Sequence, residues 1–186
     1  NPDGSVQVKM YDLLSFEERK RGEKLFFERT FYPEETQEIR LYGLGSKDII
    51  YIQGEAKNSI KIRALGGDGE DQIIDQSRVR GWRKKTLVYE KNHRSILELG
   101  KEARQLKPRE EMLYDYRRKA FAYHSYYPIP VISYSSAEGL KGGWGYLFTR
   151  RSVGKEDYAH KHSISTYLST QNNFGVNYSS KFRQVI

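Results

Sequence analysis

The sequence predicts a mainly β chain: a solenoid-like module with Gly/Asp turns, then a connector, then the first strands of an antiparallel membrane β-barrel. The chain contains 15 Tyr, 8 Phe and 16 Gly, and aromatic residues favour strands whereas glycine favours turns. A Gly/Asp-rich turn occurs twice between short apolar segments, and large and small side chains alternate over much of residues 128–186. Such period-2 alternation is typical of strands with one apolar and one polar face.

The composition limits the class of protein. Of 186 residues, 37% are hydrophobic and 30% charged, with a mean hydropathy of -0.80 and a net charge of +8. This balance is polar for one compact globule and compatible with an anionic partner. Cysteine is missing, which excludes disulfides and thiolate metal sites. The sequence has no initiator Met, no secretion signal and no apolar run near the ~20 residues of a membrane helix. The protein is therefore either cytosolic or a mature or excised piece, and we expect the piece.

The first segments follow from turn and strand signals. The tetrapeptide NPDG at residues 1–4 predicts a turn, because Pro fixes φ and Gly tolerates a positive φ. Residues 6–10 alternate between apolar and polar side chains and predict a strand, and residues 25–32 predict a second one. The charged residues 15–24 between them predict a solvated turn or a short helix.

The next stretch contains an internal repeat. Residues 38–50 and 59–74 each place a strand before a Gly/Asp turn and an Ile-rich strand after it, with Asp48 and Asp71 at equivalent positions. Repeats of this kind indicate stacked rungs, each of which buries its apolar side against its neighbour.

The second Gly/Asp turn is the candidate metal site. It matches the G-G-x-G-x-D-x-U-x nonapeptide of calcium-binding β-rolls, in which Asp68 and Asp71 would supply the hard oxygen ligands that calcium prefers. The matching turn of the first copy has Ser46 and Lys47 where acids are needed. Two interpretations therefore stay open: a calcium ion at Asp68 and Asp71, or a purely structural turn with no cofactor.

A basic run follows the repeat and suggests an alternative function. An indole among cations could stack on a base while the cations bind phosphates. The competing interpretation is a loop between strands whose cations face water. Residues 86–90 and 95–99 predict further short strands, and the charge-rich residues 100–127 predict a connector. The basic run comprises Arg78, Arg80, Trp82, Arg83, Lys84 and Lys85.

Residues 128–186 are predicted to be membrane-barrel strands. Pro128 and Pro130 keep the chain extended, and turns at Glu138-Gly139, residues 152–158 and residues 171–173 leave three to four amphipathic strands. A membrane barrel needs about eight strands, because every backbone group in lipid must be paired, so we expect only part of a barrel here. The side chains predicted to face lipid are Trp144, Tyr146, Phe148, Ile164, Leu168, Phe174, Val176, Tyr178 and Phe182.

Catalytic motifs are missing from the sequence. It contains no G-x-S-x-G, no H-E-x-x-H and no G-x-x-x-x-G-K-[ST]. His160 and His162 share one face of a predicted strand and could hold a metal, but only Glu156 and Asp157, across a turn, could complete the site. A pair that faces protein or solvent is the favoured interpretation. We expect no enzyme activity in this chain.

Two patterns carry a resemblance to a known family. One is LYGL with the later GG-x-G-x-D, and the other is the P-x-x-x-Y-x-x-x-x-G-L-x-x-G-x-G pattern formed by Pro130, Tyr134, Gly139, Leu140, Gly143 and Gly145. Together they resemble the bacterial surface antigen family, which comprises Gram-negative outer-membrane proteins with a carboxy-terminal BamA-type barrel. Many of these carry an upstream calcineurin-like metallophosphoesterase domain. The metal-binding motifs of that domain are not in this sequence, so the resemblance implies no catalytic residue.

The resemblance implies a three-part organisation: residues 1–99 as a periplasmic β-module, 100–127 as a connector and 128–186 as the opening strands of an outer-membrane barrel. The expected role is non-catalytic anchoring, linking a periplasmic domain to the barrel within an envelope assembly or transport complex. Expected partners are outer-membrane lipid, the rest of the barrel and other envelope proteins, without nucleic acid. The alternatives are a soluble calcium-binding β-roll adhesin module and a basic nucleic-acid-binding protein.

Overall fold

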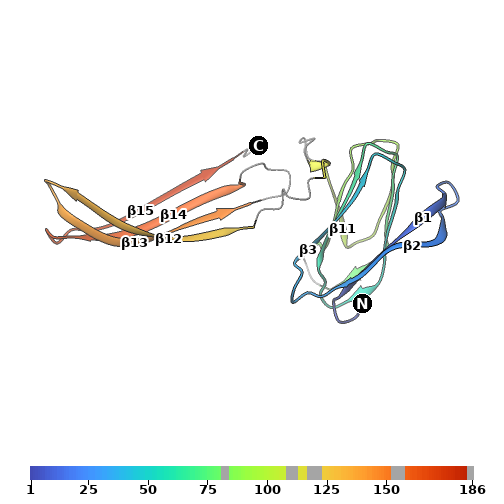
Figure 1. The fold of residues 1–186 in the computed structure, drawn as a ribbon, viewed down its shortest axis with the longest axis horizontal. Helices are drawn as coiled ribbons and strands as arrows, with labels where there is room; N and C mark the ends of the chain where they lie inside the picture. The colour runs from blue at the N-terminus through green and yellow to red at the C-terminus, as the bar shows by residue number, and fades with distance from the viewer. Residues whose placement is uncertain (81–83, 108–112, 117–122, 152–157, 184–186) are drawn as a thin grey trace. The chain divides into compact units, whose positions relative to one another are not determined.

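The computed structural model of the protein describes residues 1–80, 84–107, 113–116, 123–151 and 158–183. The described chain is mainly β, as the aromatic and glycine content predicts, and it includes a four-stranded antiparallel sheet. It divides into two compact units, Asn1–Tyr116 and Arg117–Ile186 (Figure 1). Among the described residues, no helix has the length and apolar character needed to cross a membrane.

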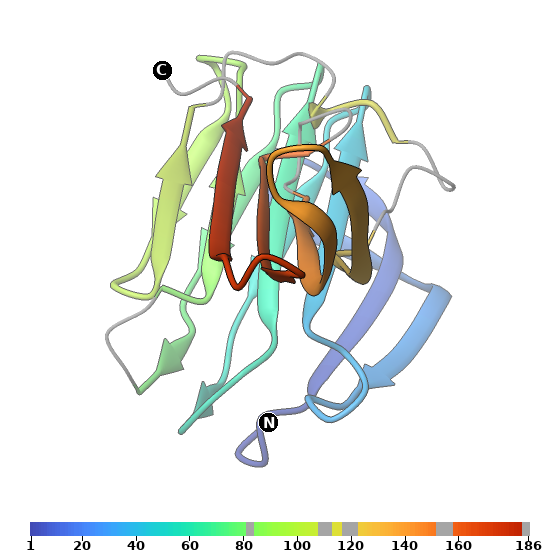
Figure 2. The same cartoon turned by 90° about the vertical axis from the view of Figure 1, so that its left-hand side faces the viewer.

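Two parallel sheets form the centre of the first unit. One has the order β11-β9-β6-β3, from Ala103–Leu106, Thr86–Tyr89, Lys61–Gly67 and Glu38–Leu44, and the other has the order β10-β7-β4, from Ile96–Leu99, Gln72–Asp75 and Ile49–Ile52. Neighbouring strands in both sheets are parallel, and Figure 2 shows them side by side in cyan to yellow-green. Along the chain, a strand of the first sheet is followed by a strand of the second. After β4 and β7 a short strand of a third parallel pair follows, β5 (Glu55–Ala56) or β8 (Arg78–Val79), so the chain winds through three sheets.

The core of the first unit lies between these two sheets. Ala64 and Val88 come from one sheet and Ile73 from the other, and all three are fully buried. Ile50, Leu97 and Leu99 pack against them from the second sheet. The β-branched residues suit this position because they pack well on a pleated surface. Burial of each large apolar side chain contributes about 1.5–3 kcal/mol.

The amino-terminal segments form a hairpin rather than two strands around a long turn. β1 (Val6–Ser15) pairs antiparallel with β2 (Lys20–Phe31), so most of the charged run predicted as a turn or helix is strand. At the tip, Arg19 Nε donates to Gln72 Oε1 over 2.7 Å, and Gln72 Nε2 donates to the carbonyl of Phe16 over 3.1 Å. The hairpin tip is thereby fastened to β7. A small parallel pair, β5 (Glu55–Ala56) with β8 (Arg78–Val79), completes the unit.

The boundary between the units differs from the predicted one. β11 lies inside the predicted connector but pairs in parallel with β9, so the first unit extends to Tyr116. The described part of this segment also includes Leu113 and Tyr114, which are buried in the first unit. The sequence hides β11 because its side chains are half-buried or exposed at the edge of a sheet and carry little apolar periodicity.

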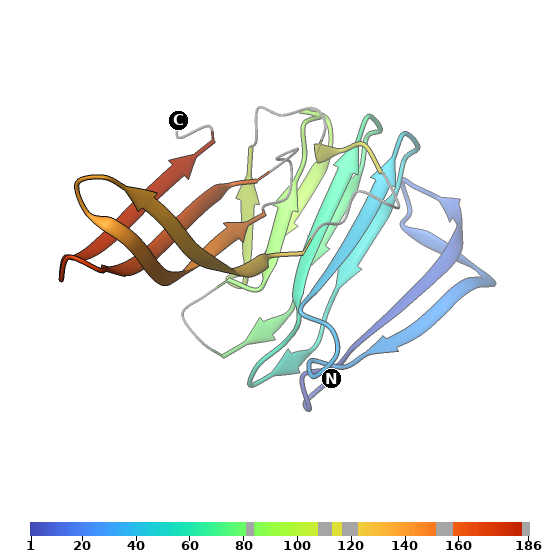
Figure 3. The same ribbon diagram turned by 60° about the vertical axis from the view of Figure 1, so that its left-hand side comes forward.

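The second unit is one antiparallel sheet of consecutive hairpins. Its strands are β12 (Ser125–Ser135), β13 (Gly139–Arg150), β14 (His160–Ser169) and β15 (Phe174–Phe182), in the order β12-β13-β14-β15. Figure 3 shows it in orange to red as a curved, twisted sheet. β12 and β15 are its outer strands, and Pro128 and Pro130 both lie on β12. Outer strands tolerate proline because its missing N–H then faces away from the sheet.

Candidate functional site

Three turns of the first unit are stacked on one another. Asp68 N donates to the carbonyl of Leu44 over 2.7 Å, which joins the second turn to the first. Asp71 N donates to Ser95 Oγ over 2.9 Å, and Asn92 donates to the carbonyl of Gly69 over 2.8 Å, which joins the third turn to the second. Linked residues are 23 or 24 positions apart in sequence. The sequence repeat identified the first two turns, whereas the third carries Lys, Asn, His and Arg in place of Gly and Asp.

Cations from the outer two turns neutralise the acids of the middle one. Lys47 of the first turn lies 3.1 Å from Glu70, and Arg94 of the third lies 2.9 Å from the same carboxylate. Lys91 forms an ion pair with Asp68, whose side chain is 76% exposed. The hydrogen bond from Lys47, with the charge of Arg94, lowers the pKa of Glu70. These ion pairs place protein cations beside the acids that a calcium ion would need on the outside of the turn.

A second group of acids points into the interior. Asp71 is fully buried, and its Oδ1 accepts a hydrogen bond from Asp48 N over 3.0 Å. Asp48 Oδ2, Asp71 Oδ2 and Glu90 Oε2 are buried and receive no hydrogen bond within the described chain. A Cβ added to Gly66 would lie 1.8 Å from Glu90 Oε2 and 2.6 Å from Asp71 Oδ2, so both oxygens face the same point, which only glycine leaves open.

Burial determines the protonation of these interior acids. Loss of solvation raises the pKa of Asp48, Asp71 and Glu90, and the charge of Asp71 adds to the rise at Asp48 and Glu90. Two carboxylates that face one another cannot both stay ionised at little cost, and a shared proton turns the repulsion into a hydrogen bond. The facing oxygens of Asp71 and Glu90 have the arrangement that such a shared proton requires.

The predicted calcium ligands therefore lie in different surroundings. Asp68 is exposed and paired with Lys91, whereas Asp71 is buried beside Asp48 and Glu90. In the described ranges, no group of three or more His, Asp or Glu side chains has an arrangement suited to a metal ion. Glu90 was missed by sequence analysis because it follows β9 directly and does not align with the turn acids of the repeat.

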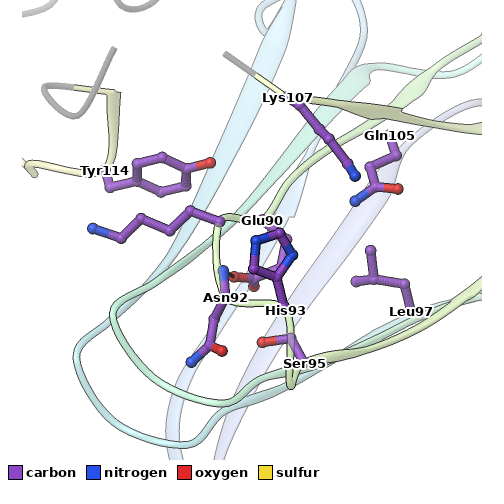
Figure 4. Close-up of a pocket in the computed structure, with 9 residues that line it drawn as sticks. Glu90, Asn92, His93, Ser95, Leu97, Gln105, Lys107 and Tyr114 are labelled. Atoms are coloured by element: carbon purple, nitrogen blue, oxygen red, sulfur yellow. Dashed lines mark hydrogen bonds between the residues drawn. The ribbon is translucent and has the colours of Figure 1, made fainter. Parts of the chain in front are cut away.

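A pocket of about 430 Å³ opens beside the third turn (Figure 4). The ends of the Lys107 and Gln105 side chains lie close to each other on one side of the view, His93 and Glu90 lie in the middle, and Tyr114 lies on the other side with its hydroxyl directed inward. Burial, with the charges of Glu90 and Tyr89, raises the pKa of Tyr114 to about 12, so its hydroxyl remains a donor at neutral pH. The lining comprises Glu90, Lys91, Asn92, His93, Ser95, Leu97, Gln105, Lys107 and Tyr114.

The basic run is only partly described. Arg78 begins β8, and both Arg78 and Arg80 are exposed. Their amides donate to the carbonyls of Gly54 and Ala56 over 2.8 and 3.1 Å, so the run continues the parallel stacking of the unit. Lys84 is exposed and Lys85 half-buried. Trp82 and Arg83, on which the base-stacking alternative depends, lie outside the described residues.

The register of the second unit gathers the predicted lipid-facing residues on one face. Tyr146 pairs with Ile164, which pairs with Tyr178. In the same way, Trp144 pairs with Thr166, which pairs with Val176, and Leu168 pairs with Phe174. Phe148 pairs with His162, and Phe182 pairs with His160. Residues opposite each other in an antiparallel sheet project to the same side. Exposure of these side chains runs from 49% at Ile164 to 66% at Phe174, apart from Phe148, which is half-buried.

β12 extends this apolar face. Tyr126, Pro128 and Pro130 pair with Phe148, Tyr146 and Trp144, and Ile132 and Tyr134 follow on the same side with exposures of 79% and 76%. The opposite face carries mainly Ser, Gly, Asn and Lys on β13, β14 and β15, together with Leu147 and Tyr167. On β12 that face carries Tyr127, Ile129 and Val131. The polar character of the opposite face is therefore concentrated on β14 and β15.

An aromatic cluster occupies one end of the apolar face. Phe148 stacks on Tyr126 with ring centroids 4.9 Å apart and contacts both histidines. His162 Nε2 lies 2.8 Å from His160 Nδ1, and His162 Nδ1 lies 2.7 Å from Tyr178 Oη. The two histidines thus share a face, as their spacing predicts, and they bond to each other. Glu156 and Asp157, the acids that the sequence placed nearest to them, lie outside the described residues.

Comparison with protein-family models, with characterised proteins and with solved structures finds no match to this chain.

Proposed function

We propose that this chain is a non-catalytic anchoring segment of an outer-membrane protein of the bacterial surface antigen family. In this proposal the four strands of the second unit are part of a BamA-type barrel whose apolar face contacts lipid. The first unit, with the linker that follows it, is a solenoid-like periplasmic module that connects the barrel to other envelope domains or partners. Any phosphoesterase activity belongs to a domain outside this chain.

The continuous apolar face of the sheet, opposed by a polar face over most of β13, β14 and β15, is the observation that carries the proposal. Large apolar and aromatic side chains from all four strands lie on one face and are about half exposed or more, except for Phe148. Exposed apolar patches of this extent mark surfaces that bind lipid or protein. Strands of nine to twelve residues also match the ~9–11 residues of a tilted membrane strand.

The open edges of the sheet support the same conclusion. Among the described residues, four strands in the order β12-β13-β14-β15 leave β12 and β15 each with one open edge. Unpaired backbone groups are costly in lipid, so a spanning sheet has to close on itself. About eight strands are the smallest number that closes in known membrane barrels. Further strands are therefore part of the proposal.

The solenoid-like assignment rests on the winding of the first unit. Its strands wind through three parallel sheets, of which β5 and β8 form the smallest, and its three stacked turns repeat every 23 or 24 residues. Each rung buries apolar side chains against the next, which is the arrangement expected of a stacked repeat. A rigid stack of this kind suits a spacer between a membrane anchor and a periplasmic partner.

A matched pair of substitutions on β14 tests the lipid contact. Ile164 lies on the apolar face and Ser165, its neighbour, on the other. We expect the full chain to float with vesicles of neutral phosphatidylcholine. Ile164→Lys should reduce the bound fraction roughly tenfold or more, since a lysine in the bilayer centre costs about 2–4 kcal/mol. Ser165→Lys adds the same charge on the opposite face and should change the bound fraction little.

Neutral lipid is used so that the positive charge of the chain plays no part in binding. A wild-type chain that stays monomeric in solution and does not bind the vesicles would contradict the proposal. Equal effects of the two lysines would also contradict it, because binding would then not depend on one face.

A further inference from the structure

The polar face of the second unit carries two lysines directly opposite each other. The register of β14 and β15 pairs Lys161 with Lys181. Like charges in directly opposite positions of an antiparallel sheet destabilise it. The next residue pair on the same face is Ser163 with Ser179, whose hydroxyl oxygens lie 2.9 Å apart. Two lysines and two serines from neighbouring strands thus occupy adjacent positions on one face of the sheet.

No carboxylate in the described part of this unit balances the two lysines. Glu138 is the single acidic residue within residues 123–151 and 158–183, and it pairs with Lys141 at the far end of the hairpins. Within the same ranges, neither Lys161 nor Lys181 forms an ion pair. Lys161 is half-buried and its Nζ lies 4.3 Å from the centroid of the Tyr158 ring. Among the described residues of this unit, the two ammonium charges therefore have no carboxylate counter-ion.

We infer that Lys161, Lys181, Ser163 and Ser179 form a binding site for a phosphate group. In a Ser–Ser hydrogen bond one hydroxyl hydrogen is used, so the other hydroxyl remains free to donate. Two ammonium groups and a free hydroxyl match the several acceptor oxygens and the double negative charge of a phosphate. A bridging phosphate also converts the repulsion between the lysines into attraction to a common partner.

The ligand is a water-soluble phosphate rather than a lipid headgroup. The lysines project from the face opposite to the apolar one, and the rows beyond them are Ser163–Ser179 and Ser165–Asn177. Such a hydroxyl- and amide-lined strip suits a hydrated solute. The site depends on the register of two strands and not on lipid contact, so it stands or falls separately from the proposed anchoring function.

Phosphate titration of the full chain tests the site. The protein is held in a non-ionic detergent, and sodium phosphate is titrated calorimetrically at constant ionic strength. We expect saturable binding to the wild type and at least a roughly tenfold weaker affinity for Lys181→Glu, the loss expected for a charge-assisted hydrogen bond. Lys161→Gln should weaken binding similarly. Lys141→Gln, which removes a lysine already paired with Glu138, should leave the affinity unchanged.

Lys181→Glu also provides a check on folding. It places a carboxylate opposite Lys161, so the sheet should unfold at the same or a higher temperature without phosphate. The inference would be overturned if the wild type showed no saturable phosphate binding. It would be overturned if Lys181→Glu and Lys161→Gln bound phosphate as tightly as the wild type, or if Lys141→Gln lost as much affinity as they do. It would also be overturned if Lys181→Glu reduced attachment to phosphatidylglycerol vesicles while leaving phosphate affinity unchanged, since the ligand would then be the lipid.

Discussion

Asp71 and Glu90 face each other across Gly66, and neither facing oxygen has a donor in the described chain. Folding removes both carboxyls from water, which raises their pKa values, and the same holds for Asp48. The folded state therefore binds protons more tightly at these groups than the unfolded state. Their stabilising contribution is complete below the ordinary pKa values of 3.8 and 4.5 and is lost as pH rises through the higher folded values.

The substitution Glu90→Gln tests how these buried carboxyls affect the free energy of unfolding. The amide keeps the acceptor for Asn92 N, which Glu90 Oε1 provides over 2.8 Å, and offers a donor to Asp71 in place of the shared proton. We expect the free energy of unfolding at neutral pH to increase by about 1–3 kcal/mol, the usual cost of a buried polar group without a partner. The gain should shrink towards zero as pH falls below the ordinary carboxyl pKa. Urea unfolding at a series of pH values measures it.

Two controls accompany this measurement. Glu98→Gln changes an acid whose pKa is lowered by its hydrogen bond with Arg19, so its effect on stability should have the opposite sign. Added calcium should leave the unfolding of the wild type unchanged if protons alone neutralise the interior acids. Stabilisation by calcium that is lost in Glu90→Gln would instead favour the calcium alternative.

Residue-level chemistry was predictable where it followed the repeat. Asp71 was identified by its motif and Asp48 by its equivalent position, and the structure joins them by a hydrogen bond. Leu44 and Gly67 are also aligned, with positive φ values of 68° and 124°. In the second turn this positive-φ position is held by Gly67, one of the two adjacent glycines of the motif. In the first turn it is held by Leu44, a residue type that adopts positive φ only at a conformational cost. Position within a repeat is thus better predicted than the side chain that occupies it.

At the scale of elements, the hairpin β1–β2 depends on its attachments. A two-stranded ribbon is marginally stable alone, and Met10, Leu14 and Phe26 on its strands are 57%, 61% and 59% exposed. Arg19 fastens the tip to Gln72 and to Glu98, on two strands of the second parallel sheet. The sequence predicted the two strands but not that they extend into the charged residues between them and pair as a hairpin. Those charged residues show no apolar alternation that would indicate a strand.

Arg19→Ala should loosen this hairpin. Each lost hydrogen bond contributes about 0.5–1.5 kcal/mol, so amide exchange along β1 and β2 should accelerate roughly three- to tenfold or more. Hydrogen exchange followed by mass spectrometry measures this effect, with the amides of β6 and β7 as internal references. Lys20→Ala removes the exposed neighbouring cation and should leave exchange unchanged. Equal acceleration in both variants would show that Arg19 is not the attachment.

The four strands of the second unit were easier to predict than β11. Alternation along residues 144–148, 164–168 and 174–182 follows directly from a sheet with unlike faces, and the turns near Glu138-Gly139 and residues 171–173 carry positive φ at Gly139 and Asn172. β11, in contrast, is a four-residue edge strand in which the two central side chains, Arg104 and Gln105, are exposed and polar. Its pairing with β9 is a tertiary contact that no local pattern records.

At the scale of the whole molecule, the two units differ in where they place apolar side chains. All buried apolar side chains in the described chain lie between Ile39 and Tyr114, whereas the side chains that are buried in the second unit are Thr149 and Ser169. The first unit therefore carries a core of its own. The second unit exposes large apolar residues on one face, which is the surface that the proposed lipid contact would cover.

A fragment of residues 1–116 should consequently fold in water without detergent. We expect a β-type circular dichroism spectrum and one cooperative urea transition, because the buried cluster around Ala64, Ile73 and Val88 is complete in this fragment. The substitution Val88→Ala should lower its stability by about 1–3 kcal/mol. A fragment that unfolds gradually, or only gains structure with detergent, would show that its core needs the second unit.

The prolines of β12 have a consequence for how the sheet can grow. Pro128 and Pro130 stand on an outer strand that keeps its pairing with β13, so the donors they lack are missing from the free edge. β15, the other outer strand, contains no proline and offers a full set of donors and acceptors. A strand that joins the sheet therefore finds a better template on the carboxy-terminal side, which gives assembly a direction along the chain and makes stray association through β12 less favourable.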